Sequence, residues 1–490
     1  MACLNKDLLE DWGLSAKITD GDDVARWMNS APHPFAMAYA GHQYGYFTML
    51  GDGRAMLLGE WQNESGHCYD IHLKGSGPTP FARGGDGHAT LRYMLREFLI
   101  SEALYGLGVP TTRSLMVLET PYKVWRDVDQ RGGVLFRMAP HHVRIGTLEY
   151  AIRALAPEEY ARFAGAVLER TTLWWSKQGN VDQGFSLYRL GKPHPEAVLA
   201  FFEEWTRRQA ELVAQWMRVG FVHGVLNTDN ISLLGITMDF GPCAFVNTYD
   251  LNQSFSSIDS HGRYAWGRQG DIMAWNAEVL LSCLLPLLDG DHDNQRAMQI
   301  ATDMLQRFRT LCDKAMERMQ WMKLGLDPDQ AHGNVKVHSL VADWQAWLST
   351  TRPDYTQAYL NLEQVLAQFR SRSLDGDEVL GQGGESLYDL QEKNFPSKLW
   401  MMEWLKAVEH SAESGFLAAL ERMHRNNPAV FPRNHRVEEA LDQKVLQGCD
   451  DLWDELIQAF CNPYERNARN RELNQPPSQE DAGYCTFCGT

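Results

Sequence analysis

The chain has 490 residues, of which 44% are hydrophobic and 22% charged, and its formal net charge is −17 at pH 7. This length predicts two to four domain-sized units, and the composition is typical of a soluble globular protein. The negative balance argues against a nucleic-acid or anionic-membrane binder, because both need a basic surface. It leaves room for a local basic pocket that holds a nucleotide.

No apolar run approaches the ~20 residues of a membrane span. The first residues form neither a signal-peptide core nor an Arg-rich transit segment. The nine cysteines follow no framework spacing, except for Cys485 and Cys488 at the C-terminal end. Scattered cysteines suit a reducing compartment, so we predict a cytoplasmic protein without a membrane span.

The first 146 residues predict a small antiparallel sheet with one important helix. A helix is expected at 23–29. The Gly-Asp-Gly sequence at 51–53 favours a hairpin turn into an apolar strand, and a second strand ends on Lys74. Glycine has no Cβ, so backbone N–H groups at such a turn can approach an anion. An ordinary hairpin turn is the simpler interpretation of this motif alone.

A helix is predicted over 89–105, with Glu97 at the edge of its apolar face. A carboxylate at a buried edge needs a cation, and Lys74 is the candidate. Three further strands are expected at 114–118, 122–126 and 133–138. The order of glycine turn, strand lysine and helix glutamate is that of a protein-kinase N-lobe.

Two arginines stand near the end of this region. Arg137 lies on the last predicted strand, and Arg144 follows it. Arginines at a domain junction can clamp phosphate oxygens bidentately, although two surface arginines are the simpler interpretation.

The composition turns helical from about residue 147. Apolar residues at helical spacing predict core helices rather than a cofactor site. The residues 371–386 are rich in Gly, Asp and Ser and predict a linker, and 467–482 predict a poorly ordered polar tail. Helices are expected at 157–176, 196–219, 272–288, 292–326, 335–370, 396–410, 414–425 and 437–460.

The most informative stretch runs from Phe221 to Asn230 and continues at Asp239-Phe240-Gly241. A short hairpin over 231–238 would bring Asp229, Asn230 and Asp239 to one end. Oxygen ligands of this kind hold Mg²⁺ or Mn²⁺, and a free carboxylate can orient or deprotonate an attacking hydroxyl.

Ordinary kinases place an aspartate two residues after the histidine of this loop. Val225 occupies that position after His223. If the chain is an enzyme, Asp229 must therefore supply the carboxylate.

Several motifs together resemble the selenoprotein O family, a kinase-like family of protein adenylyltransferases. The resemblance covers nearly the whole chain. It is carried by the sequences at 39–43, 50–55, 73–80, 85–87, 223–230, 239–242, 262–264 and 486–490.

The resemblance implies an α+β, protein-kinase-like two-lobe fold with a helical C-terminal extension. It also implies that ATP binds in a flipped orientation and that AMP is transferred to Ser, Thr or Tyr hydroxyls of proteins, with self-modification possible. The expected divisions are an N-lobe at 1–146, a C-lobe core at 147–290, a helical region at 291–466 and a tail at 467–490.

The family motifs also imply roles for individual residues. Asp229 would be the proton acceptor, and Asn230 and Asp239 would hold the metal. Lys74 would meet the phosphates and pair with Glu97. The remaining nucleotide contacts would be Gly51, Gly53, Arg54, Asp86, Gly87, Arg137, Arg144 and Asp239.

The chain departs from the family pattern at several positions. It begins late relative to family members, Gly270 stands where the family has proline, and Cys488 stands where eukaryotic members carry selenocysteine. Family members have a regulatory disulfide between the tail and a cysteine after Asp-Phe-Gly, where this chain has Phe255, with Cys243 nearby. A disulfide that pins the tail through Cys485 or Cys488 remains a candidate.

Three functions stay open on these grounds. The first is AMP transfer. The second is UMP transfer or phosphotransfer by the same residues. The third is a non-catalytic, ATP-binding redox sensor.

Overall fold

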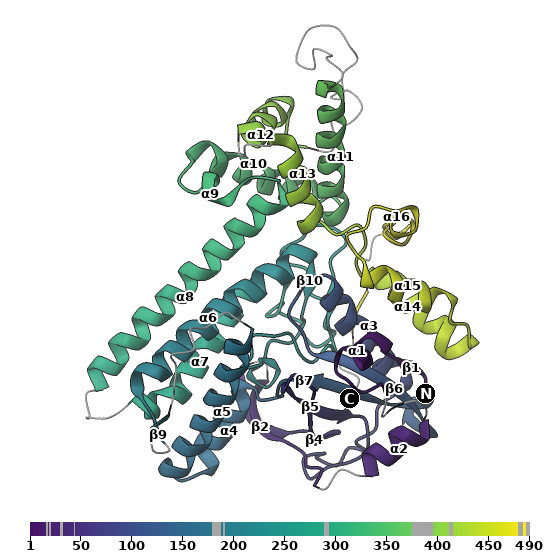
Figure 1. Ribbon diagram of the computed structural model, residues 1–490, viewed down its shortest axis with the longest axis vertical. Coiled ribbons are helices and arrows are strands. Elements are labelled where there is room, and N and C mark those ends of the chain that lie inside the picture. Colours follow the sequence, from purple (N-terminus) through teal and green to yellow (C-terminus); the bar gives the residue numbers. More distant parts are fainter. Residues whose placement is uncertain are drawn as a thin grey trace.

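The structure is a computed structural model, and it describes residues 1–15, 18, 21–29, 33–43, 45–178, 188–189, 192–288, 294–374, 395–410, 415–478 and 484–486. The predicted linker lies mostly outside these residues, as does Cys488. The described part is α+β, with a small antiparallel sheet and many helices (Figure 1).

The main sheet has five strands in the order β1-β6-β7-β5-β4, and all neighbours are antiparallel. A separate hairpin pairs β2 (Ala38–Gln43) with β3 (Tyr46–Gly51). The strands of the main sheet are β1 (Cys3–Leu4), β4 (Ala55–Gln62), β5 (Cys68–Lys74), β6 (Arg113–Arg126) and β7 (Val128–Ala139).

The sheet region differs from the prediction in three ways. The strands expected at 114–118 and 122–126 are one long strand, β6, and the short β1 adds an unpredicted edge. The Gly-Asp-Gly turn does not form a hairpin, because β3 pairs with β2 whereas β4 pairs with β5. The turn therefore carries the chain from one sheet to another.

The helix α3 (Leu91–Gly106) packs on the sheet through β6 and β7. It begins at Thr90, whose side chain accepts a hydrogen bond from the Tyr93 amide and so caps the helix. Its buried residues include Leu95, Phe98 and Leu99, as the apolar spacing predicts. This packing fixes the position of Glu97 relative to β5.

The helices that follow form a second part of the molecule, beside the sheet (Figure 1). Most predicted positions are confirmed within a few residues, but 335–370 is divided into two helices, 437–460 is interrupted by a π-helical turn and a loop, and the helix at 145–154 was not predicted. The single long helix α8 runs up to α9 and α13. The helices are α4 (Ile145–Ala154), α5 (Pro157–Lys177), α6 (Pro195–Val219), α7 (Gln269–Leu288), α8 (Asn294–Lys323), α9 (Pro328–Ala331), α10 (Val335–Thr351), α11 (Tyr355–Leu374), α12 (Lys398–His410), α13 (Gly415–Asn426), α14 (Asn434–Asp442), α15 (Asp451–Cys461) and α16 (Ala468–Leu473).

Smaller elements complete the fold. Two short helices near the N-terminus pack against the sheet region, and only the second was predicted. The elements are α1 (Lys6–Asp11), α2 (Gly21–Asn29), β8 (Tyr188–Arg189), β9 (Lys192–Pro193), β10 (Phe221–Val222), β11 (Ala244–Phe245), the 3₁₀ helices η1 (Thr228–Asn230) and η2 (Trp266–Arg268), and the π-helical turn η4 (Gln443–Gln447).

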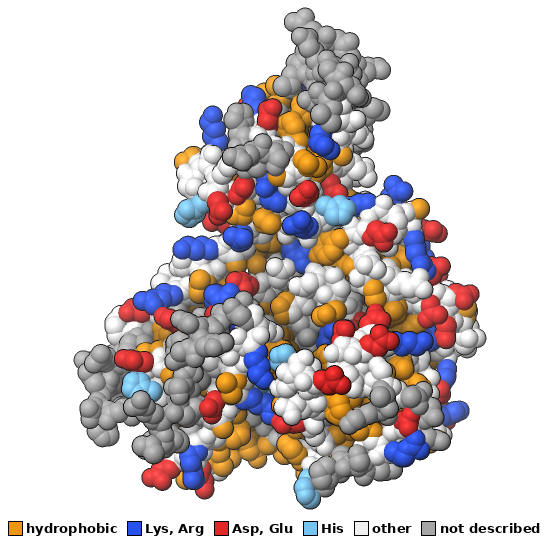
Figure 2. Space-filling model, viewed as in Figure 1, with side chains coloured by type: hydrophobic (Ala, Val, Ile, Leu, Met, Phe, Trp, Pro, Cys, Tyr) orange, Lys and Arg blue, Asp and Glu red, His pale blue; other side chains and the backbone are white. Residues whose placement is uncertain are grey.

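One described stretch, Trp266–Leu288, is long and apolar enough to cross a membrane, with a mean hydropathy of 1.4. The expectation that no apolar run approaches this length was therefore too strict. More than half of the stretch is buried, and Leu280 and Leu284 belong to the core. The core helix of a soluble protein passes the same test. Figure 2 shows basic and acidic side chains interspersed over one face of the molecule.

The region predicted as a poorly ordered polar tail contains α16, so that prediction is wrong for its first part. Asn470 is buried, and its amide nitrogen donates to the backbone oxygens of Asn462 and Glu465. Asn474 is buried beside Arg433. Polar side chains here satisfy buried backbone groups rather than solvent.

Candidate functional site

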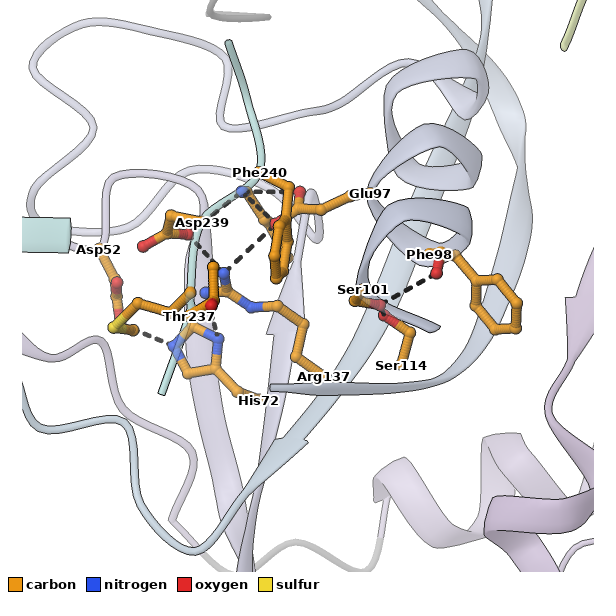
Figure 3. Close-up of polar contacts among 12 residues, drawn as sticks. Asp52, His72, Glu97, Phe98, Ser101, Ser114, Arg137, Thr237, Asp239 and Phe240 are labelled. Atoms are coloured by element: carbon orange, nitrogen blue, oxygen red, sulfur yellow. Dashed lines mark hydrogen bonds and ion pairs between the residues drawn. The ribbon is translucent and has the colours of Figure 1, made fainter. Parts of the chain in front are cut away.

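The predicted ion pair between Lys74 and Glu97 is present. Lys74 is the last residue of β5, and its Nζ lies 2.8 Å from the Glu97 carboxylate on α3. Both side chains are buried, at 7% and 5% exposure. Figure 3 shows Glu97 near Asp239. The pair fixes the lysine amine at the inner end of a cleft.

Asp239 lies at the centre of the site. Three cations surround its carboxylate: Arg137 Nη1 at 2.5 Å, Arg144 Nη2 at 3.1 Å and Lys74 Nζ at 3.4 Å. Burial alone would raise the pKa of Asp239, but the attraction of these cations, Arg137 first, holds it well below its usual range. The predicted phosphate clamp and the predicted metal ligand therefore meet at one point.

The backbone of Asp239 is in the left-handed region, with φ of +61°. Non-glycine residues rarely adopt this conformation, and it is maintained only where the surrounding structure imposes it. It turns the carboxylate towards the arginines.

A second layer of polar residues, missed in the sequence, holds these arginines. His72 Nε2 lies 2.9 Å from Asp52 Oδ2, and Arg137 Nη2 lies 3.1 Å from His72 Nδ1. Arg144 Nη1 donates to Asp52 Oδ1 over 3.3 Å. Together with the contacts of both arginines to Asp239, these contacts form a closed ring, and Figure 3 shows its His72 and Arg137 side.

The ring defines the protonation of its members. Arg137 can only donate, so His72 Nδ1 accepts and the proton sits on Nε2, which donates to Asp52. Burial lowers the pKa of His72 and keeps the imidazole neutral. For Asp52, burial opposes ionisation, but His72 and Arg144 lower the pKa below its usual value. The signals in the sequence were the aspartate between two glycines and a histidine two residues before Lys74, on the same face of β5.

Asp229 lies in η1, packed under the β2–β3 hairpin and α4. A Cβ on Gly41 would lie 2.4 Å from Asp229 Oδ1, so the glycine permits this close approach. Oδ1 is buried and has no hydrogen-bond partner among the described residues. Burial, with smaller contributions from Asp239 and Glu149, raises the pKa of Asp229 to about 6.

The hairpin expected over 231–238 does not form. Ser232 bridges to Arg144 and Thr237 bridges to Thr111, so both ends of the segment pair with residues distant in the sequence rather than with each other. His223 Nε2 lies 3.0 Å from the Met238 backbone oxygen and connects the start of the 223–230 loop to the residue before Asp239. The prediction that Asp229, Asn230 and Asp239 meet is nevertheless correct, since all three line one cleft.

This cleft has a volume of about 730 Å³. It brings together every residue for which a nucleotide, metal or catalytic role was predicted in the described part of the chain, except Glu97, which stands behind Lys74, and Cys485. Those lining residues are Gly51, Gly53, Arg54, Lys74, Asp86, Gly87, Arg137, Arg144, Asp229, Asn230 and Asp239.

Two of these residues lie at the outer side of the cleft. Asp86 is ion-paired with Arg126, at 2.7 Å, and the Arg126 hydrogen bond lowers the pKa of Asp86 to about 2. Gly87 has φ of +67°, and a Cβ there would lie 2.2 Å from the Gly77 backbone. No other residue type fits at Gly87 without moving the loop.

The metal prediction fits the side chains present. Asn230 Nδ2 donates to the Val225 backbone oxygen over 3.1 Å, which leaves the amide oxygen for a ligand. Among the described residues no group of three or more His, Cys, Asp and Glu side chains could hold a metal. Asn230 and Asp239 would therefore hold Mg²⁺ or Mn²⁺ only together with substrate phosphates and water, which is the usual mode for Mg²⁺.

The end of the chain returns to this region. The Thr486 amide donates to the Phe255 backbone oxygen over 2.7 Å, and the Thr486 hydroxyl donates to the Pro242 backbone oxygen over 2.7 Å. Cys485 is exposed and Cys243 is fully buried. Thr486 therefore lies beside Phe255 and beside Pro242, the residue that follows Asp-Phe-Gly.

Comparison with known proteins agrees with this geometry. A family described as protein adenylyltransferase SelO matches residues 1–460. A protein nucleotidyltransferase YdiU from Bacillus cereus (strain B4264) is 40% identical over 458 residues, which are 94% of this chain and 85% of that protein. A protein of the same name from Bacillus thuringiensis (strain Al Hakam) is similar to the same extent.

The chain has an α+β fold, and its cleft brings Lys74, which pairs with Glu97, together with two arginines, Asn230 and Asp239. These features and the relatives show that it is a nucleotidyltransferase. The chain belongs to the SelO family.

Proposed function

We propose that this enzyme transfers AMP from ATP to Ser, Thr or Tyr hydroxyls of protein substrates, and that it can modify itself. The observation that carries the proposal is the cleft lined by three cations, by Asn230 and Asp239, and by Asp229, whose Oδ1 has no hydrogen-bond partner among the described residues. A protein-kinase-like arrangement, with lobes meeting near residue 146, is part of the same proposal.

The cations would bind the phosphates. Lys74, Arg137 and Arg144 all face Asp239, and each can exchange this carboxylate for a phosphate oxygen without leaving the cleft. Asn230 and Asp239 would hold Mg²⁺ or Mn²⁺. The bound ion would supply positive charge to the phosphates and stabilise negative charge as the phosphate ester forms.

Asp229 would act on the acceptor. Its carboxylate lines the cleft and can accept the proton of a hydroxyl that enters it, while Oδ1 is buried against Gly41. A pKa of about 6 leaves the carboxylate ionised at neutral pH, yet makes it a stronger base than an exposed aspartate. Val225, in the position of the kinase aspartate, offers no alternative base.

The test measures which phosphate of ATP becomes attached to protein. The chain is incubated with Mg²⁺ and either α-³²P-ATP or γ-³²P-ATP, and protein is separated and counted. AMP transfer labels protein from the α-position only, whereas phosphotransfer labels it only from the γ-position. Mass analysis of self-modified protein, with UTP offered in parallel, distinguishes AMP from UMP. If no nucleotide labels the protein, the non-catalytic sensor is the function that remains.

A further inference from the structure

A second cleft, of about 630 Å³, lies between α6 and α8, which run side by side (Figure 1). It shares no lining residue with the nucleotide cleft. Part of its wall is Leu234, Gly235 and Ile236, the rear of the turn that joins Asn230 to Asp239. The two clefts therefore lie on opposite sides of the same loop.

The lining of this rear cleft is strongly basic in a chain of net charge −17. Five cationic side chains face one carboxylate, that of Glu211. The cations are Arg207, Arg208, Arg218, Lys314 and Arg318.

Most of this positive charge is not neutralised by the protein. Glu204 and Glu211 pair with Arg207, and Glu204 also pairs with Arg208. Arg218 is only 4% exposed, and its guanidinium bonds to neutral oxygens such as the Leu107 carbonyl rather than to a described carboxylate. Burying a cation without an anion costs several kcal/mol, on the order of the penalty for one uncompensated charge.

The two cations from α8 are also available. Lys314 and Arg318 stand one helical turn apart and are exposed, and neither has an ion-pair partner in the described part of the chain.

One lining side chain carries a donor without a partner. Arg208 Nη2 is buried and has no hydrogen-bond partner among the described residues, although Arg208 Nε bonds to Glu204 at 2.7 Å. Burial lowers the pKa of Arg208, while Glu204 opposes that shift. An anion accepting from Nη2 would satisfy the orphaned donor.

The rest of the wall is apolar. Trp174 comes from α5, and Leu311, Met319 and Met322 come from α8. A cavity of this size suits a small organic ligand, and polar groups among apolar walls fix its orientation. Inorganic ions would leave the apolar surface unused.

We propose that the rear cleft binds a small organic anion in which a phosphate- or carboxylate-type group is joined to an aromatic or other apolar body. The anionic group lies among Arg208, Lys314 and Arg318, and the apolar body packs on the methionines. Gly235 packs closely against Arg208, since a Cβ added to this glycine would lie only 2.8 Å from Arg208 Cβ. The bound anion therefore also bears on the loop that carries Asn230 and Asp239.

The test uses 1-naphthyl phosphate as probe, titrated calorimetrically into the full chain with and without Mg²⁺ and α,β-methylene-ATP, which occupies the nucleotide cleft. The variant carries Lys314→Glu and Arg318→Glu, two exposed positions whose reversal leaves the core intact. The control carries Arg309→Glu and Lys336→Glu, which change the total charge equally but lie outside the rear cleft.

Wild type and control should bind the probe alike, and the variant at least tenfold more weakly. 1-Naphthol and inorganic phosphate should each bind wild type at least tenfold more weakly than the probe. Hydrogen exchange should slow in peptides covering 234–236 when the probe is bound. Equal binding by variant and wild type, equal binding of 1-naphthol, or unchanged exchange at 234–236 would each overturn the proposal.

Discussion

Lys74 Nζ lies 2.8 Å from the carboxylate of Glu97, and the two residues are 23 positions apart on different elements. The pair holds the lysine amine extended across the sheet towards Asp239. Without the carboxylate the amine has no fixed partner on α3, so its position relative to the phosphates is lost.

We therefore expect Glu97→Gln to reduce nucleotidyl transfer by about tenfold or more, since misplacing a binding group costs rate through orientation. Glu102→Gln is the matched control, because Glu102 is on the same helix but pairs with Arg113 away from the cleft. Transfer is measured by α-³²P labelling, and folding by thermal unfolding. Equal loss of transfer in both variants would mean that α3 stability, and not the ion pair, controls activity.

Asp229→Asn should lower transfer by about 10²–10⁴-fold, the usual cost of removing a general base, with nucleotide binding retained. The wild-type rate should rise with pH through about 6, the pKa of Asp229, and level off above it. A flat profile between pH 5 and 8 would move the base elsewhere, with Asp239 or Asp86 the next candidates.

Asp229→Asn should lower activity but raise the stability of the fold above the pKa of Asp229. Between pH 3.8 and about 6 the folded chain keeps a proton on Asp229 that the unfolded chain has lost, so this group lowers the free energy of unfolding as pH rises. Asp229→Asn should therefore raise Tm relative to wild type at pH 8 and leave it unchanged near pH 4. A lower Tm at pH 8 would show that the Asp229 carboxylate is stabilising instead.

Asp239→Ala should abolish metal-dependent transfer and also destabilise the fold. The change leaves three cations around an empty position, and removing one partner of a buried ion pair commonly costs about 3–5 kcal/mol. EDTA should stop labelling by the wild type, and Mg²⁺ or Mn²⁺ should restore it. Labelling that persists in EDTA would rule out the metal role of Asn230 and Asp239.

Asp52→Asn should act through Arg144 and His72, which it contacts, rather than through the substrate. The depressed pKa of Asp52 means that its ionised form stabilises the fold above its unfolded pKa near 3.8, and this contribution is lost as the carboxylate is protonated at lower pH. The variant should be less stable at pH 7, and its KM for ATP should rise more than its kcat falls, because the arginine is misplaced. An unchanged KM would assign Asp52 a structural role only.

The redox prediction concerns the tail. We expect Cys488→Ser to keep basal transfer but to blunt any response to dithiothreitol, and transfer with and without reductant is the measurement. If wild type is itself insensitive, the switch is absent, and Phe255, which contacts the tail at Thr486, would be the reason.

The sequence predicted most of the helices from local periodicity. It predicted the Lys74–Glu97 pair from a lysine at a strand end and a carboxylate beside the apolar face of a helix. It did not predict the partners of Asp52 and His72, because a buried polar side chain is satisfied by residues that are distant in the sequence. The incorrect hairpins have the same origin. Ser232 and Thr237 pair with Arg144 and Thr111, and no pattern within 231–238 indicates these partners.

The carboxylate of Asp239 has a thermodynamic consequence for ligand binding. Because it holds Arg137 and Arg144, a triphosphate bound as proposed would compete with it for the same guanidinium groups. A divalent cation held by Asp239 would occupy the carboxylate and release the arginines. Under the proposed function we therefore expect metal and nucleotide to bind with positive cooperativity, each increasing the affinity for the other by the same factor.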